Sequence, residues 1–266
     1  MSDELEGKHG VQSLEIGMGI LRAMVNGQRA MMLKDIAAAA AMPPSKAHRY
    51  LVSLIRAGLV EQDPLTSRYD LGPFALNIGL VAIDRLDRVR LGLSAIALLR
   101  DQINETTALA VWSENGPVIV RWERPRRPIT VNVVTGTALE ILSSASGRVF
   151  AAWMQNDAVN RLISKELKAG EHLPPHLKTR ADVDAMLAQV RADGYSAISD
   201  YYLVRGVEAV AAPVFNFRNE ITMGMLAVGV KGMFDIAPDS PVVTGVKRAA
   251  ADLSVRLGYT GGGATA

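Results

Sequence analysis

Apolar side chains recur three and four positions apart through the first part of the chain, a spacing that predicts short helices. Residues 13–27, "SLEIGMGILRAMVNG", show it and end on Asn26-Gly27, a stop signal. The residues at this spacing are Leu14, Met18, Leu21 and Val25. Residues 32–42, "MLKDIAAAAAM", predict a second short helix with a small-residue face. Two prolines follow, and because proline is tolerated in a first helical turn, they begin a third helix.

The third helix, which begins at Pro43 and Pro44, places its apolar and polar residues on opposite sides. The apolar side consists of Ala47, Tyr50, Leu51, Leu54 and Ile55, and the polar side of Ser45, Lys46, Arg49, Ser53 and Arg56. Gly58 ends the helix, and residues 59–72 predict two short extended runs around a Pro-Leu-Thr-Ser turn. Helix, helix, turn, helix and hairpin are the elements of a winged helix-turn-helix, which we place at residues 10–72.

From Pro73 the pattern is helical again, and it predicts a linker helix over residues 73–86 and a second domain over 87–259. The predicted helices of that domain cover about 88–107, 145–167, 180–193 and Pro241 to Leu257. The predicted strands cover 108–113, 118–123, 129–134, 207–215 and 221–230, and residues 196–206 are predicted to form a loop. Helices segregated around an antiparallel sheet give an α+β fold. Residues 260–266 are predicted to be a disordered tail.

Charge changes this picture only locally. The chain of 266 residues has 29 basic and 27 acidic residues, so its formal net charge is +2. Any binding to a polyanion must therefore come from a local patch. The polar side of the third helix is such a patch, because it carries cations and hydroxyl groups and no carboxylate. Lysine and arginine neutralise phosphates, arginine also pairs with guanine, and serine binds either the backbone or a base.

This patch supplies the candidate contacts with DNA. The leading residues of a recognition helix reach base edges, so Ser45, Lys46 and Arg49 are the best candidates for contacts with bases. The full candidate set is Pro44, Ser45, Lys46, His48, Arg49, Ser53 and, on the hairpin, Arg68. The alternative is a solvated polar face without a partner, which is the commoner role of an amphipathic helix.

Other signals argue against secretion, a membrane and metal or covalent catalysis. The chain has no cysteine, which excludes disulfides and suits a reducing cytoplasm. The start, "MSDELEGKHG", does not resemble a secretory signal, and no apolar run is long enough to span a bilayer. His172 and His176 flank two prolines without a third ligand, and "SSASGR" lacks the flanking glycine of a nucleophile elbow. We expect a cytoplasmic protein with no metal, no cofactor, no catalytic residue and no membrane partner.

The chain resembles the IclR-type bacterial transcriptional regulators from Val11 to Tyr259. The matching stretches are "VQSLEIGMGILRAM", "PPSKAHRYLVSLIRAGLVE", "RYDLG", "SSASGRVFAAW", "DGYSAISD" and "GVEAVAAPVFN", in the family's order and spacing. The resemblance implies a winged helix-turn-helix, a linker helix and a GAF-like domain that binds a small effector, in a dimer or a dimer of dimers. One departure is Ala41, where the family commonly has glycine in the turn between helices.

The resemblance also implies an effector site against the sheet, capped by the start of the helix at "SSASGRVF". The positions that match the family's site are Ala145, Ser146, Gly147, Asp200, Ala209, Ala227 and Gly229. A helix start has free backbone donors that can hold a carboxylate; alternatively, the small residues there only allow close packing. Alanine and glycine stand where the family has small hydroxyl-bearing residues, and Tyr202 where it has glutamate. The departures favour a partly apolar acid, such as an aromatic one, over a small keto acid.

Three functions remain open at this point. The first is a ligand-responsive regulator that binds double-stranded operator DNA as a homodimer or tetramer, paired through the apolar faces of residues 74–83. The second is an enzyme that carries a helix-turn-helix, and the third is a regulator whose C-terminal domain only assembles subunits. A basic cluster at Arg121, Arg124, Arg126 and Arg127 fits DNA, an anionic effector, a partner subunit or solvent.

Overall fold

The structure is a computed structural model that describes residues 10–27, 30–84, 87–126, 135–136, 138–170, 173–199 and 206–261. The chain divides into two compact units, Met1–Leu86 and Asp87–Ala266. Four predicted features lie partly or wholly outside the described residues: the strand at 129–134, the end of the linker helix at 85–86, Asp200 with its two tyrosine neighbours, and most of the C-terminal tail.

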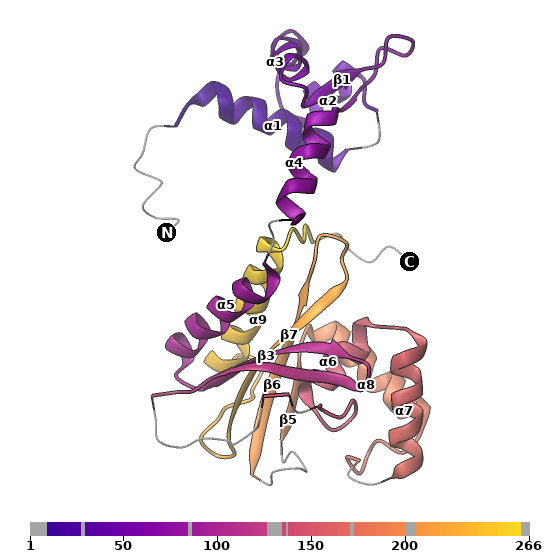
Figure 1. The fold of residues 1–266 in the computed structure, drawn as a ribbon, viewed down its shortest axis with the longest axis vertical. Coiled ribbons are helices and arrows are strands. Elements are labelled where there is room, and N and C mark those ends of the chain that lie inside the picture. Colours follow the sequence, from indigo (N-terminus) through magenta and orange to yellow (C-terminus); the bar gives the residue numbers. More distant parts are fainter. Residues whose placement is uncertain are drawn as a thin grey trace. The chain divides into compact units, whose positions relative to one another are not determined.

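The first unit consists of helices around a small sheet (Figure 1). Its elements are α1 (Gln12–Asn26), α2 (Leu33–Ala39), α3 (Pro44–Arg56), β1 (Val60–Gln62), β2 (Tyr69–Leu71) and α4 (Pro73–Asp84). The two strands pair antiparallel, and Met31 adds a bridge to Tyr69. Ile20, Ile36 and Leu51, one from each of the first three helices, are fully buried at the centre of its core. The predicted helix-turn-helix with a hairpin is confirmed.

The predicted spacing marks only part of the buried face of α1, because Leu21 is the one residue of the predicted set that faces the core. The residues that face the core are Gly17, Ile20, Leu21 and Met24. Leu14, Met18 and Val25 are instead 64%, 49% and 60% exposed. Both sets repeat at helical spacing, so periodicity alone does not identify which apolar face is buried. Leu14, Met18 and Val25 therefore leave α1 with a second, uncovered apolar face in this unit.

The ends of α2 and α3 use the same turn with different residues. Beyond α2, the Met42 N–H donates to the Ala37 carbonyl, and Ala41 has a φ of +50°. Beyond α3, the Leu59 N–H donates to the Leu54 carbonyl, and Gly58 has a φ of +71°. Glycine suits this left-handed position and alanine does so at a cost. The turn at Ala41 therefore has the same geometry as the turn at Gly58, but its backbone is strained.

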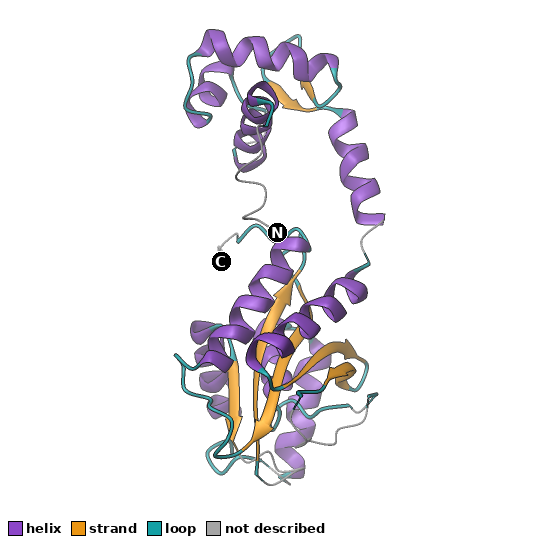
Figure 2. Ribbon diagram, turned by 90° about the vertical axis from the view of Figure 1, so that its left-hand side faces the viewer, coloured by secondary structure: helices purple, strands orange, loops and turns teal. Residues whose placement is uncertain are grey.

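The second unit is an antiparallel sheet between two layers of helices (Figures 1 and 2). Its strands are β3 (Thr106–Ser113), β4 (Gly116–Glu123), β5 (Ser196–Ser199), β6 (Val207–Phe215) and β7 (Ile221–Val230), in the order β4-β3-β7-β6-β5. Its helices are α5 (Arg88–Ile103), α6 (Ala145–Trp153), α7 (Asp157–Ala169), α8 (Arg180–Asp193) and α9 (Pro241–Arg256). The predicted α+β fold is confirmed. The loop prediction for 196–206 is wrong at its start, because Ser196–Ser199 pairs with β6 as the edge strand β5.

Side chains alternate between the two faces of this sheet. On β7, Leu226 and Val228 belong to the core under α6 and α8, and a Cβ on Gly224 would lie 3.3 Å from the Phe150 ring of α6. Met223 lies on the other face, where its sulfur is close to Gly92 of α5. We call these the α6 face and the α5 face of the sheet. Among the described residues, no helix is long and apolar enough to cross a membrane.

Candidate DNA-binding surface and effector site

The polar side of α3 is open to solvent. The exposed residues there include Pro44, Ser45, Lys46, His48, Arg49, Ser53 and Arg56. Ala47, Leu51 and Leu54 face the core, while Tyr50 and Ile55 are half-buried. Neither Lys46 nor Arg49 has an ion-pair partner in the part of the chain that the structure describes. The Ser53 hydroxyl donates to the Arg49 carbonyl at 3.4 Å. The helix can thus present two unpaired cations to a polyanion.

Arg68 differs from the other DNA candidates because the fold already uses it. Its guanidinium donates to the Ala30 carbonyl at 2.8 Å, which ties the hairpin to the segment before α2. In the hairpin turn, Asp63 accepts from the Leu65 N–H and the Thr66 hydroxyl at 2.9 and 2.6 Å. The Thr66 bond, more than the Leu65 one, holds the pKa of Asp63 below its usual value. Arg68 therefore has a structural contact that its sequence position does not reveal.

The start of α6 is buried and closely packed. Ser144 caps the helix, with its hydroxyl accepting from the Gly147 N–H at 2.9 Å. A Cβ on Gly147 would lie 2.1 Å from the Glu140 carbonyl oxygen and 2.5 Å from the Ile141 Cα, so only glycine fits there without movement. Ser146 is fully buried, and its Oγ has no hydrogen-bond partner among the described residues. A buried hydroxyl left unpaired is costly, which makes it a candidate ligand contact.

The turn Glu140–Ser144 before α6 is held by two charged side chains. The Glu166 carboxylate of α7 accepts from the Ile141 and Leu142 N–H groups at 2.7 and 2.8 Å. The Arg148 Nε of α6 donates to the Leu142 carbonyl at 2.8 Å. Burial raises the pKa of Glu166, against the lowering by those two bonds, and burial lowers the pKa of Arg148 to about 10. Sequence patterns did not identify Glu166, because its partners are backbone atoms 24 and 25 residues away.

The predicted effector residues on the strands do not share one face. Ala209 pairs with Val228 on the α6 face, where the start of α6 also lies. Ala227 pairs with Thr107, whose hydroxyl donates to the Ile96 carbonyl of α5, so Ala227 lies on the α5 face. Gly229 shares that face, and a Cβ on it would lie 2.2 Å from the Phe234 ring. The prediction that Ala227 and Gly229 line the same site as Ala145, Ser146, Gly147 and Ala209 is therefore wrong. Asp200 lies outside the described residues.

The α6 face of the sheet is apolar with polar groups at its margins. One row of paired residues crosses all five strands: Trp122, Ala108, Leu226, Ala211 and Ser196. The indole Nε1 of Trp122 and the hydroxyl of Ser196, at the two ends, are buried without a hydrogen-bond partner among the described residues. The alternation of residues along each strand predicts this row only when the pairing register of each strand is known.

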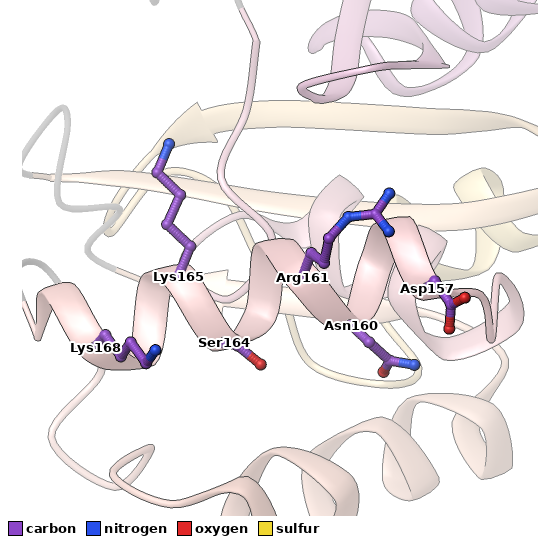
Figure 3. A pocket seen from close by; sticks show the side chains of 6 residues that line it. All are labelled: Asp157, Asn160, Arg161, Ser164, Lys165 and Lys168. Atoms are coloured by element: carbon purple, nitrogen blue, oxygen red, sulfur yellow. The ribbon is translucent and has the colours of Figure 1, made fainter.

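A separate groove of about 530 Å³ follows one side of α7 (Figure 3). Its lining residues are Asp157, Asn160, Arg161, Ser164, Lys165 and Lys168. Asn160 points toward α8, where the Arg180 guanidinium donates to its side-chain oxygen at 3.0 Å. Arg161, Lys165 and Lys168 have no ion-pair partner within the described ranges, so this side of α7 is a solvated basic face that can attract anions.

The basic cluster of the β4 region is partly neutralised. Arg121 pairs with Glu123 at 3.2 Å, and Arg126 approaches Asp101 at 3.7 Å. Arg127 lies outside the described residues, as does His172 of the histidine pair. The described part of the chain holds no group of three or more His, Asp or Glu side chains that could bind a metal.

Known proteins resemble both units. The chain matches the family model of the IclR helix-turn-helix domain over residues 13–64 and that of the bacterial transcriptional regulator IclR C-terminal domain over 82–255. It is 30% identical to the glycerol operon regulatory protein of Streptomyces griseus, over 93% of this chain and 97% of that protein. The crystal structure of Pseudomonas aeruginosa HmgR is 36% identical, with a TM-score of 0.83 and coverage of 94% and 100%.

A further solved structure shares the fold and carries a ligand. It is an IclR homologue from Microbacterium hydrocarbonoxydans complexed with 4-hydroxybenzoate, 21% identical, with a TM-score of 0.53 and coverage of 92% and 99%.

Proposed function

The chain belongs to the IclR family of bacterial transcriptional regulators, and we propose that it binds operator DNA through α3 as a homo-oligomer and responds to an organic acid at the start of α6. The observation that carries the DNA-binding part is the exposed side of α3. It bears Lys46, Arg49 and hydroxyl groups, no carboxylate, and no ion pair within the described residues. Such a face neutralises phosphates and contacts base edges in the major groove.

The test of DNA binding is to incubate the purified chain with fragments of the host genome at fixed salt and to map the fragments retained. We expect a short set of sites that share a pseudo-palindrome. Retention that is the same for all sequences, and that vanishes at moderate salt, would indicate phosphate contacts alone. A regulator of this kind needs more than that, since specific sites are bound far more tightly than bulk DNA.

The homo-oligomer rests on apolar surface left uncovered on the first unit. Phe74, Leu76, Ile78 and Val81 of α4 are 49%, 63%, 49% and 46% exposed. Phe74, Ile78 and Val81 are spaced to lie on one side of α4; exposed apolar surface of this kind marks an interaction site, and a second copy of the chain would supply the matching half of a palindrome. Light scattering should give at least a dimer at micromolar concentration. A monomer that still binds one operator tightly would contradict this proposal.

The effector proposal rests on the α6 face of the sheet. Ala209, Leu226 and Val228 make that face apolar, while Ser146 at the α6 start has a buried hydroxyl with no partner among the described residues. An apolar surface with a few polar groups suits a ring that carries a carboxylate. The fold relative from Microbacterium hydrocarbonoxydans binds 4-hydroxybenzoate, an acid of that class. We propose an aromatic acid as the effector.

The measurement is a thermal melt of the full chain with 4-hydroxybenzoate or pyruvate. A ligand that binds only the folded chain adds about 2.7 kcal/mol at a hundredfold excess over its dissociation constant. We expect the aromatic acid to stabilise more than pyruvate, and Ser146→Ala to lose that response while melting normally without ligand. A chain that responds to no acid, yet assembles and binds DNA, would favour the alternative in which the second unit only joins subunits.

A further inference from the structure

We propose that Glu166 of α7 is a positioning residue for the effector site: it holds the turn Glu140–Ser144 and thereby sets the start of α6, where the effector binds. This inference rests on the effector site proposed above. It adds a residue outside that site, on a helix that shares no residue with the predicted effector set. Three contacts carry it, in the order in which they lead from α7 to α6.

The first contact joins α7 to the turn. Both carboxylate oxygens of Glu166 are engaged, one with the Ile141 N–H at 2.7 Å and the other with the Leu142 N–H at 2.8 Å. Charge-assisted bonds of this kind are stronger than neutral ones. Two consecutive N–H groups that point at one carboxylate fix the orientation of the turn as well as its distance from α7.

The second contact closes the turn from the other side. The Leu142 carbonyl accepts from the Arg148 guanidinium, so Leu142 is bound to an anion through its N–H and to a cation through its carbonyl. No carboxylate forms an ion pair with Arg148 in the described ranges. The two half-buried charges are therefore linked through the backbone of one residue. Hydrogen bonds in such a chain polarise one another and strengthen together.

The third contact passes the position of the turn to α6. Gly147 lies directly against the Glu140 and Ile141 backbone, where even a methyl group would not fit. A shift of the turn must therefore move the first turn of α6, because close-packed backbones do not slide without a gap opening or closing. Ser146, with its unpartnered hydroxyl, is next to Gly147 in that helical turn.

The charge on Glu166 distinguishes a positioning role from a purely structural one. Burial raises the pKa of Glu166, so its ionised form costs stability in the folded chain. The charged groups that act on it are Glu140 of the turn, which raises its pKa, and Lys165 of α7, which lowers it. Arg148 of α6 is bound to the same turn. The positioning role uses the second hydrogen bond that only the ionised carboxylate provides.

The experiment compares full-length wild type with Glu166→Gln and, as a matched control, Glu114→Gln at an exposed glutamate in the β3–β4 turn. Amide hydrogen exchange at Ile141, Leu142 and Gly147 is measured without ligand, and affinity for 4-hydroxybenzoate by calorimetry between pH 5 and pH 8. A glutamine keeps one acceptor and faces the other N–H with a donor. We expect exchange at the three amides to rise about tenfold and the affinity to fall about tenfold, the loss of roughly one charge-assisted bond.

The dependence of ligand affinity on pH gives a signature that a structural cap would lack. As the pH falls through the raised pKa of Glu166, the Ile141 and Leu142 amides of wild type should lose protection from hydrogen exchange. Wild type should also lose affinity for 4-hydroxybenzoate, in both cases relative to Glu166→Gln. Global stability should show the opposite sign. The folded chain holds the Glu166 proton more tightly than the unfolded chain, so the stability of wild type relative to Glu166→Gln should decrease as pH rises through the same window.

Each outcome decides the proposal. Faster exchange with wild-type affinity and pH profile would reduce Glu166 to a structural cap, and unchanged exchange would show that it does not hold the turn. If Glu166→Gln does not fold, wild type alone still tests the proposal. As the pH is lowered, the amide protection factors at Ile141 and Leu142 must decrease before those in β6 and β7 do. If wild type binds no acid but exchange at Gly147 rises in Glu166→Gln, the proposed effector function fails and the link from α7 to α6 stands.

Discussion

Helix α3 and strand β7 are both central to the proposed function, but assigning a site position one residue too early or too late has different consequences in each. Neighbouring positions on a helix differ by about 100° in direction, so the exposed side of α3 is broad enough to keep Ser45, Lys46 and Arg49 together. Neighbouring positions on a strand point to opposite faces. The predicted pair Ala227 and Gly229 therefore lies on the α5 face, while Leu226 and Val228 lie on the α6 face.

The two regions also differ in what a substitution changes. The side chains on the polar side of α3 are exposed, so their loss affects partners more than the fold. The residues of the α6 face and of the α6 start are buried, so a change there first affects stability.

Gly147→Ala should have the largest effect, because its Cβ would meet backbone atoms of Glu140 and Ile141 that cannot rotate away. We expect a loss of about 3 kcal/mol or more in the free energy of unfolding, at the upper end of overpacking effects. The measurement is urea denaturation of the full chain, followed by one probe in each unit. Gly19→Ala is the control, since an added methyl group in α1 would meet nothing within 4 Å. Equal stability of the two variants would mean that the α6 start is loosely packed.

Arg49→Ala should leave stability unchanged and cost about 1–3 kcal/mol of specific DNA binding if Arg49 pairs with a base. Lys46→Ala should weaken all sequences alike and lower the slope of log affinity against log salt by about one, as expected for a lost phosphate contact. The measurement is operator affinity across a salt series. Arg256→Ala, at an exposed position of α9, is the control. Operator affinity that Arg49→Ala leaves at the wild-type value would remove Arg49 from the base-contacting set.

The sequence was sufficient for features that depend on local periodicity or on the order of elements. The hairpin, the strands β6 and β7 and the terminal helix follow from local patterns, and the helix-turn-helix follows from the order of its elements. The buried face of α1 could not be chosen, because both of its apolar stripes repeat at helical spacing. The short edge strand β5 was missed because four residues carry too little alternation, and its pairing with β6 is what defines it.

The effector site required long-range information that one sequence does not contain. Ala145, Ser146 and Gly147 lie at the start of α6 as predicted, because a helix start has a local signal in the Ser144 cap. The positions on the strands depend on register, which is fixed by pairing between β3, β6 and β7. Glu166 has no local signal at all, since its function is to bind backbone groups in a distant turn.

Val228→Thr and Ala227→Ser test directly on which face of the sheet the effector binds. Each adds a hydroxyl group with little change in size, the first on the α6 face and the second on the α5 face. We expect Val228→Thr to shift the preference between 4-hydroxybenzoate and pyruvate toward pyruvate by about 1 kcal/mol, the value of one modest hydrogen bond. Ala227→Ser should leave the preference unchanged. Calorimetry with both acids is the measurement, and a shift caused only by Ala227→Ser would place the ligand on the α5 face.

Ala41→Gly should have the smallest effect and the opposite sign. Ala41 closes the turn between α2 and α3 at a φ of +50°, where a side chain costs about 1–2 kcal/mol that glycine does not incur. Glycine also makes the unfolded chain more flexible, which offsets about 0.5–1 kcal/mol of the gain. The variant should therefore be more stable by up to about 1 kcal/mol. Ala39→Gly, inside the last turn of α2, has no strain to relieve and should lose about 1 kcal/mol. Thermal melts of both variants provide the comparison. If Ala41→Gly is destabilised as much as Ala39→Gly, the left-handed turn is not strained, and glycine offers no advantage at the point where this chain departs from its family.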